Sequence, residues 1–135
     1  MHIYEQKNIK IFYADDDPDD TFFFESAANE IDKKIKLSIF TSGVALLEKA
    51  NFDSSFHTII FLDVNMPLKN GLECLRDIRD NSVWDSVPVF IMSTSNSDIL
   101  KEKALMLGAA GYIEKPTDFK KLKEKIREAL RSTMV

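Results

Sequence analysis

The sequence is poor in the residues that cross-link or interrupt small proteins. It contains one Cys, four Gly and four Pro in 135 residues. The single Cys, Cys74, excludes a disulfide framework and any zinc site with several Cys ligands, and a free thiol is typical of a reducing compartment. The low Gly and Pro content excludes collagen-like chains and chains dominated by linkers.

Long apolar runs are also absent. The longest, Val87–Met92, is interrupted by Pro88 and is far shorter than the about 20 residues that cross a bilayer. The first ten residues, MHIYEQKNIK, have no apolar run behind their charges, so they do not form a secretory signal. We therefore expect a cytoplasmic protein that does not bind a membrane.

No charge of one sign dominates. The chain has 18 Lys and Arg against 22 Asp and Glu, a formal net charge of -4, and 44% hydrophobic residues. This composition is globular, and its mild acidic excess predicts no nucleic-acid partner. The length fits one domain with one core. We expect a single domain over residues 1–135, with its core at about 8–131 and no effector domain.

Short apolar runs alternate with amphipathic stretches along the chain. The runs predict strands at 9–14, 36–40, 58–62, 87–92 and 111–113. The amphipathic stretches predict helices at 21–29, 43–50, 71–80, 98–107 and 118–131, and Pro18 suits a first helical turn before residue 21. Strands that alternate with helices form βα units, so the pattern predicts an α/β fold with a doubly wound, five-stranded parallel sheet in three α/β/α layers.

Chemically distinctive side chains follow four of the expected strands. In sheets of this kind, ligands bind at the carboxyl ends of the strands. The residues at those ends are Asp15, Asp16 and Asp17 after the first strand, Asp63 after the third, Ser93 and Thr94 after the fourth, and Lys115 and Pro116 after the fifth. If the first and third strands are neighbours, their carboxylates converge.

The expected carboxylate cluster requires a cation, because close carboxylates repel one another. Its donors are all oxygen, with no His or Cys nearby, which favours a hard cation such as Mg²⁺. Ser93 adds a hydroxyl and Lys115 an ammonium group. A carboxylate nucleophile, a divalent metal, a Lys and a hydroxyl are together the parts needed to receive a phosphoryl group.

Four segments resemble the receiver domains of two-component response regulators, and the chain is similar to the stand-alone chemotaxis regulator of that family. They are YADDDPDD, FLDVNMPLKNGLECL, PVFIMSTS and LGAAGYIEKP, and the resemblance covers nearly the whole chain. The spacings from Asp63 to Ser93 and from Ser93 to Lys115 are those of the family, and with Pro88 in register they assign Ser93 rather than Thr94 to the switch hydroxyl. The resemblance implies a flavodoxin-like strand order, 2-1-3-4-5.

The resemblance also implies roles for the residues of the cluster. Asp63 would be the phosphoacceptor, and Lys115 would pair with a phosphoryl oxygen. Asp15 and Asp16 would position Mg²⁺, with Asp16 favoured as the direct ligand. Asp63 and the backbone carbonyl of Asn65 would complete the metal site, and the bond from Lys115 to the following Pro would be cis.

A second set of residues would switch and tune the reaction, again by resemblance. Ser93 and Tyr112 would form the switch, and Asn65, Thr94 and Ser95 would tune the rates. The chain departs from the family at two of these positions. Ser93 stands where Thr is commoner, and Thr94 stands where a smaller residue is usual. Both departures bear on rates more than on function.

The resemblance implies a signalling protein, not an enzyme beyond phosphorylation and dephosphorylation of itself. The phosphoryl group would come from a histidine kinase, a histidine phosphotransfer protein or a small phosphodonor. A downstream protein would bind the surface formed by the helix at 98–107, the strand at 111–113 and the helix at 118–131. We expect a monomer or weak dimer.

The acidic segment DDDPDD admits other interpretations. Asp19 and Asp20 are equally typical of a solvated helix N-terminus, where the helix dipole favours Asp. Asp15, Asp17 and Asp19 partly match the Asp-x-Asp-x-Thr motif of haloacid-dehalogenase-like phosphatases, although the chain is short for that class. The two functions differ in the residue that takes the phosphoryl group, which is Asp15 in the phosphatase and Asp63 in the receiver.

Two further alternatives have less support. Asp15, Asp17 and Asp19 also match the start of a calcium-binding loop, but the sixth position is Asp20 instead of Gly and the twelfth is Ser26 instead of Glu. A degenerate receiver that only binds partners would lack the acceptor or the Lys, and the sequence has both.

Overall fold

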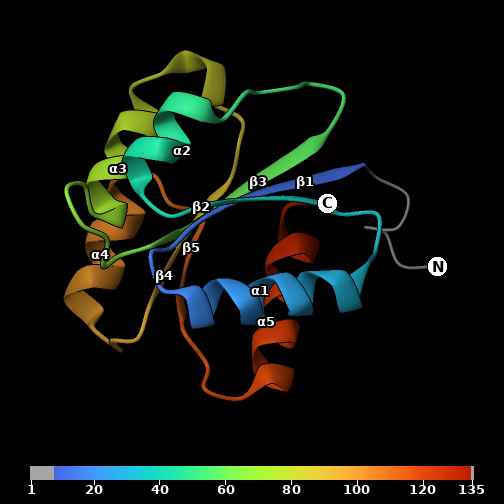
Figure 1. The fold of residues 1–135 in the computed structure, drawn as a ribbon. Coiled ribbons are helices and arrows are strands. Elements are labelled where there is room, and N and C mark those ends of the chain that lie inside the picture. Colours follow the sequence, from blue (N-terminus) through green and yellow to red (C-terminus); the bar gives the residue numbers. More distant parts are fainter. Residues whose placement is uncertain (1–7, 135) are drawn as a thin grey trace.

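The computed structural model describes residues 8–134, which form one five-stranded parallel sheet between two layers of helices (Figure 1). The strands are β1 (Ile9–Ala14), β2 (Lys36–Phe40), β3 (His57–Asp63), β4 (Val89–Ser93) and β5 (Gly111–Glu114). They lie in the order β2-β1-β3-β4-β5, and all neighbours are parallel. The expected doubly wound, flavodoxin-like sheet is confirmed.

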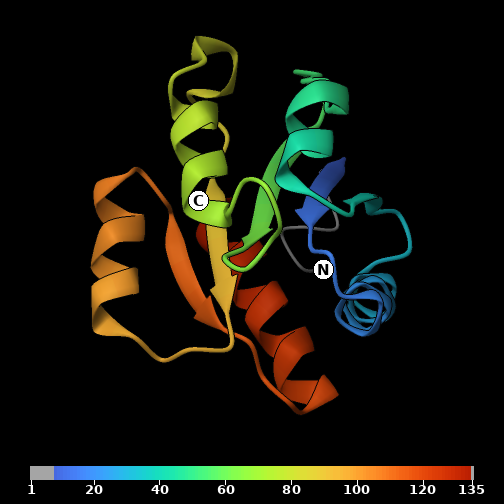
Figure 2. The same ribbon diagram turned by 60° about the vertical axis from the view of Figure 1, so that its left-hand side comes forward.

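Helices cover both faces of the sheet. They are α1 (Pro18–Ile31), α2 (Gly43–Lys49), α3 (Gly71–Arg79), α4 (Asp98–Met106) and α5 (Phe119–Ser132), with a short 3₁₀ helix, η2 (Ser82–Trp84), after α3. The helices α1 and α5 pack together on one face, and α2, α3 and α4 lie on the other (Figures 1 and 2). Within residues 8–134, no helix is both long enough and apolar enough to cross a membrane.

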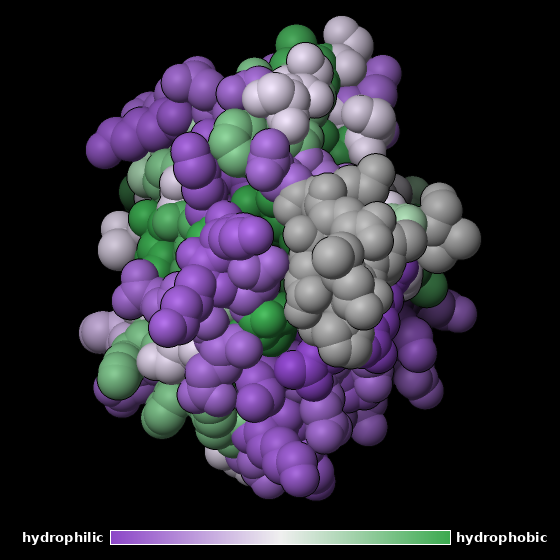
Figure 3. Space-filling model, turned by 90° about the vertical axis from the view of Figure 1, so that its right-hand side faces the viewer, coloured by the Kyte–Doolittle hydropathy of each residue, from purple (hydrophilic) through white to green (hydrophobic). Residues whose placement is uncertain are grey.

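The central strands are buried on both faces, as is usual for parallel strands between helix layers. Ile59 and Phe61 of β3 belong to the core beside α1 and α5, and Ile60 and Leu62 belong to the core on the other face. This alternation follows from the pleat of a strand, and it explains why β3 is a continuous apolar run in the sequence. The outer surface seen in Figure 3, by contrast, is mostly hydrophilic.

Helix α1 begins earlier than expected, at Pro18 rather than at residue 21, and continues to Ile31. Asp17 caps it, because its Oδ1 accepts hydrogen bonds from the backbone N–H groups of Asp19 and Asp20 at 2.9 and 3.4 Å. Pro18 takes the first helical position, where its fixed φ is favourable and its missing N–H costs nothing. Asp20 therefore lies in the first turn of α1, close to the end of β1.

The strands β3 and β4 end one position later than expected, and both ends carry candidate residues. β3 includes Asp63, and β4 covers Val89–Ser93 instead of 87–92. Pro88 has no N–H to donate, and its carbonyl accepts a hydrogen bond from the N–H of Ile60 at 3.0 Å. Asp63 pairs with Met92, and Ser93 pairs with Glu114, so the sheet fixes the backbones of Asp63 and Ser93.

Candidate functional site

Three carboxylates meet where β1 and β3 end. Parallel pairing aligns Ala14 of β1 with Leu62 of β3, so the residues that follow, Asp15 and Asp63, lie side by side. Asp16 completes the group, because one carboxylate oxygen of each of the three residues lies within 4.8 Å of the others. The predicted convergence of the two strand ends is confirmed.

Asp15 is a fully buried carboxylate with both oxygens hydrogen-bonded. The hydroxyl of Tyr13 donates to Oδ2 at 2.6 Å, and the backbone N–H of Asp17 donates to Oδ1 at 3.0 Å. Burial, together with the charge and hydrogen bond of Asp15, raises the pKa of Tyr13 far above its ordinary value, so the hydroxyl remains a donor. Asp16, in contrast, is exposed.

Sequence analysis missed Tyr13. A Tyr in an apolar strand is ordinarily a core residue, and Tyr13 is that as well, since its ring stacks on Phe24 with the centroids 4.0 Å apart. The available signal was the two-residue spacing from Asp15, because alternate residues of a strand lie on the same side of it.

Lys115 binds three carboxylates at once. Its Nζ lies 2.9 Å from Asp15 Oδ2, 2.7 Å from Asp20 Oδ2 and 2.9 Å from Asp63 Oδ1. Burial acts to lower the pKa of Lys115, but its contacts with the accepting carboxylates of Asp20, Asp15 and Asp63 outweigh burial and raise the pKa above its ordinary value. Two of the three N–H donors of the ammonium group form hydrogen bonds with Asp15 and Asp20, and Asp63 lies within ion-pair distance.

Asp63 is 4% exposed and lies beside this one cation among several acids. Burial raises its pKa to about 6; the hydrogen bond from Lys115 acts in the opposite direction, and the charges of Asp15 and Asp20 raise the pKa further. The pKa of Asp20 is likewise raised by burial, against the effect of Lys115. One lysine therefore does not neutralise the cluster.

The donor set suits a hard divalent cation. Asp15, Asp16 and Asp63 offer carboxylate oxygens close enough to bind one ion, and all-oxygen sites of this kind prefer Mg²⁺ or a similar metal. Asp15, Asp20 and Asp63 share the one ammonium group of Lys115, and Asp16 lies beside them, so the site carries more negative charge than Lys115 balances. Asn65, whose carbonyl was expected to join the metal site, is an exposed residue in the loop after β3.

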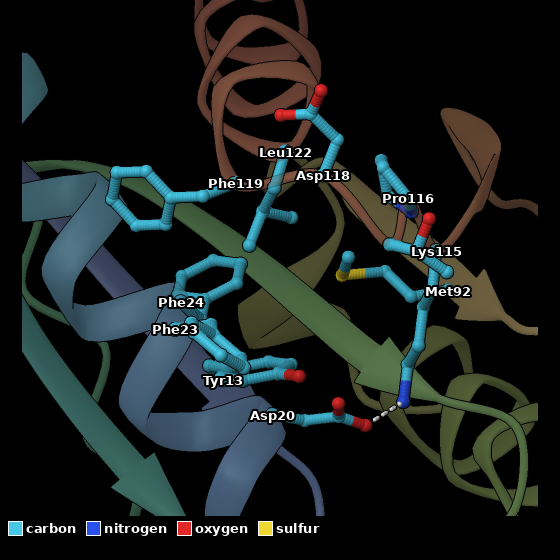
Figure 4. A pocket seen from close by; sticks show the side chains of 11 residues that line it. Tyr13, Asp20, Phe23, Phe24, Met92, Lys115, Pro116, Asp118, Phe119 and Leu122 are labelled. Atoms are coloured by element: carbon cyan, nitrogen blue, oxygen red, sulfur yellow. Dashed lines mark hydrogen bonds and ion pairs between the residues drawn. The ribbon is translucent and has the colours of Figure 1, made fainter.

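Asp20 joins the site, although sequence analysis did not distinguish it from Asp19. Its carboxylate points from the first turn of α1 to Lys115 (Figure 4). Asp19 is exposed and, among the described residues, its carboxylate forms no hydrogen bond or ion pair. The solvated-terminus interpretation thus holds for Asp19 and is wrong for Asp20. The distinction depends on the direction in which each side chain leaves the first turn of α1.

The switch candidates Ser93 and Tyr112 are connected by hydrogen bonds through Ser95. Ser93 is buried, and its hydroxyl accepts the N–H of Ser95 at 3.0 Å. The hydroxyl of Tyr112, which is half-buried, donates to the carbonyl of Ser95 at 2.6 Å. Thr94, which lies between Ser93 and Ser95 in the sequence, is exposed. Ser95 therefore links Ser93 to Tyr112, a connection that the sequence did not reveal.

The expectation of a cis bond between Lys115 and Pro116 is wrong. No peptide bond within residues 8–134 is cis. The backbone N–H of Lys115 donates to the carbonyl of Ser93 at 2.7 Å, and its side chain reaches the carboxylates across the pocket from there. The trans isomer, which is intrinsically preferred by about 0.5–1 kcal/mol, thus already places the ammonium group.

The loop after β3 packs tightly against the backbone of Asp63. A Cβ atom on Gly71 would lie 2.4 Å from the carbonyl oxygen of Asp63, a distance that no side chain tolerates. The N–H of Gly71 also donates to the carbonyl of Val64 at 3.1 Å. Gly71 therefore allows α3 to begin directly against the strand end that carries Asp63.

Comparisons with known proteins agree with this geometry. Residues 11–127 match the family model described as "Response regulator receiver domain". The sensory transduction protein RegX3 of Mycobacterium leprae is 37% identical over 91 residues, which cover 67% of this chain and 43% of RegX3. This chain spans less than half the length of the curated relatives that it matches.

Solved structures share the fold. The Mn(2+)-bound form of response regulator Rcp1 is similar with a TM-score of 0.75 at 22% identity, over 93% of this chain and 94% of Rcp1. Chemotaxis response regulator CheY4 of Vibrio cholerae gives a TM-score of 0.73 at 24% identity, over 89% of this chain and 97% of CheY4. Because both identities are below 25%, this similarity shows that the fold is shared and nothing more.

Proposed function

The chain belongs to the response regulator receiver domain family, whose members signal by phosphorylation of an Asp, and from this premise we propose that it accepts a phosphoryl group on Asp63 in a Mg²⁺-dependent reaction. The observation that carries the proposal is the position of Asp63. It ends β3 beside Asp15 and Asp16, with its Oδ1 2.9 Å from Lys115 Nζ. We place the receiver unit at residues 8–131.

The donor would be a phosphohistidine of a histidine kinase or of a histidine phosphotransfer protein. A carboxylate oxygen of Asp63 attacks phosphorus, a P–O bond forms, and the P–N bond breaks with its electron pair left on the imidazole nitrogen. Lys115 pairs with a phosphoryl oxygen during the transfer. Later, water attacks phosphorus, the P–O bond to Asp63 breaks, and the carboxylate and inorganic phosphate are released.

The metal would be held by the carboxylates of Asp15, Asp16 and Asp63 and by the backbone carbonyl of Asn65. When bound, Mg²⁺ supplies positive charge to the oxygens of the transferring group. Asp15 would hold the ion in a fixed position, because Tyr13 and the N–H of Asp17 fix both oxygens of its carboxylate. Asp16 is exposed and can adjust to the ion.

The arrangement disfavours the alternative phosphatase, in which Asp15 is the nucleophile. Asp15 is fully buried, and Tyr13 and Lys115 both contact its Oδ2. The other residues of the motif do not assemble around it either, since Asp17 caps α1 and Asp19 is exposed. Both oxygens of Asp15 thus already accept hydrogen bonds, which favours a fixed metal ligand over a nucleophile.

The contacts behind the site suggest how the surface responds. A phosphoryl oxygen on Asp63 would accept a hydrogen bond from the Ser93 hydroxyl, and a shift of that hydroxyl toward the phosphoryl group would pull on the Ser95 N–H that it now accepts. Because Tyr112 is bonded to the same Ser95, its ring would move with that segment and change the surface of α4, β5 and α5, where we place the downstream protein. The NMR chemical shifts of the Tyr112 ring should change when a phosphoryl mimic binds the wild-type protein, and Ser93→Ala should suppress that change. Identical Tyr112 ring shifts with and without the mimic would refute the proposed response.

Phosphorylation by acetyl phosphate tests the proposed function. With Mg²⁺, the wild-type protein should gain one phosphoryl group by intact-mass measurement, and with EDTA it should gain none. Asp63→Asn should not be labelled, whereas Asp19→Asn, which makes the same substitution outside the site, should be. Stable labelling of Asp63→Asn would contradict the proposal.

A further inference from the structure

The ion pairs of Lys115 differ in how they are held. The side chains of Asp15 and Asp63 are 0% and 6% exposed, whereas that of Asp20 is 34% exposed. Asp15 and Asp63 are also fixed at strand ends, but Asp20 comes from the first turn of α1. Asp20 is thus the partner of Lys115 that water can most readily replace.

A phosphoryl group on Asp63 carries more negative charge than the carboxylate it replaces and needs Lys115, two of whose three N–H donors form hydrogen bonds with Asp15 and Asp20. Releasing Asp15 would leave a buried carboxylate short of a partner, which is costly. Releasing Asp20 costs less, because water can solvate its carboxylate. A cavity of about 100 Å³ beside the ion pair, lined in part by Phe23 and Phe119, gives both side chains room to separate (Figure 4).

We propose that Asp20 is a positioning residue that holds Lys115 in the unphosphorylated protein and competes with the phosphoryl group for it. The inference rests on the proposed function of Asp63. Asp20 orients the ammonium group next to Asp63, and its charge then opposes the gain of further negative charge at the same nitrogen. Asp20 thereby sets how tightly the phosphorylated form is held.

Beryllofluoride, a tetrahedral anion that binds a carboxylate oxygen as a phosphoryl group does, is the probe. Its dissociation constant is measured by calorimetric titration at saturating Mg²⁺ for the wild type, Asp20→Asn and Asp19→Asn. Asp20→Asn should bind beryllofluoride roughly three- to tenfold more tightly than the wild type, as expected for the loss of one partly exposed competing ion pair. Asp19→Asn should bind like the wild type, because Asp19 is exposed on the same helix turn and does not contact Lys115.

Two further variants separate a positioning role from a structural one. Asp20→Glu keeps the charge and should restore weaker binding, and Asp20→Ser is a second neutral variant if Asp20→Asn does not fold. Tighter binding cannot result from general damage to the fold, which would weaken it. Equal affinity of Asp20→Asn and Asp19→Asn, or weaker binding by Asp20→Asn, would overturn the inference. A wild-type protein that binds no beryllofluoride would instead overturn the proposed function.

Discussion

Tyr13 and Asp15 share a buried hydrogen bond of 2.6 Å, in which the tyrosine hydroxyl donates to Oδ2 of the carboxylate. The same oxygen lies 2.9 Å from Lys115 Nζ. Stacking on Phe24 fixes the direction of the hydroxyl. The carboxylate that begins the acidic segment is thus oriented from inside the core, by a tyrosine of the strand that precedes it.

Tyr13→Phe should lower the free energy of unfolding by about 1.5–3 kcal/mol, the usual range for a hydrogen bond to a charged group. The ring and its stacking on Phe24 are retained, so the loss reports the hydroxyl alone. Tyr112→Phe is the matched control, since its hydroxyl bonds a backbone carbonyl at an exposed position. Urea unfolding in EDTA measures both. Equal stability of the two variants would show that the Tyr13 hydroxyl does not support Asp15.

Asp63→Asn should stabilise the metal-free protein at neutral pH. The pKa of Asp63 rises from 3.8 to about 6 on folding, so the folded state binds the proton more tightly than the unfolded chain does. The contribution of Asp63 to stability therefore falls as the pH rises from about 4 to about 6 and stays low above that. At about 1.4 kcal/mol for each pKa unit, the penalty at pH 7 is about 3 kcal/mol, which Asp63→Asn removes.

Urea unfolding in EDTA at several pH values between 4 and 8 measures this penalty. The advantage of Asp63→Asn over the wild type should be absent near pH 4 and should grow up to about pH 6. Asp19→Asn should track the wild type throughout. An advantage that is the same at every pH would mean that Asp63 does not titrate in this range.

Mg²⁺ should stabilise the wild-type protein, because it binds only the folded arrangement of Asp15, Asp16 and Asp63. For a millimolar dissociation constant, about ten millimolar Mg²⁺ adds roughly 1.4 kcal/mol, which is a few degrees in the melting temperature of a domain of this size. The increment should shrink in Asp16→Asn and in Asp63→Asn but not in Asp19→Asn. Thermal melts at constant ionic strength measure it, and an unchanged wild-type melt would mean that the carboxylates form no metal site.

Lys115→Gln should destabilise the metal-free protein by about 3–5 kcal/mol, since it leaves buried carboxylates without their cation. Part of the loss should be recovered with Mg²⁺. Lys123→Gln, which breaks the more exposed pair with Glu30, should cost less than about 1 kcal/mol. Chemical unfolding of both variants in EDTA provides the comparison; a small effect of Lys115→Gln would mean that the cluster does not depend on this lysine.

The sequence predicted the parts of the site that are fixed by strands. Asp15, Asp63 and Ser93 follow clear apolar runs, and parallel pairing leaves one arrangement for strand ends. The contributions of Tyr13 and Asp20 could not be predicted in the same way. The spacing in β1 and Pro18 at the start of α1 place both residues near the end of β1, but which side chains meet there depends on side-chain directions that local pattern does not determine.

The most direct test of the account is to locate the phosphoryl group. After reaction with acetyl phosphate and Mg²⁺, the aspartyl phosphate is reduced with borohydride and the modified residue is identified by peptide mass spectrometry. The account predicts modification at Asp63 in the wild type and no stable modification in Asp63→Asn. Modification at Asp15 or Asp20 in the wild type would contradict it.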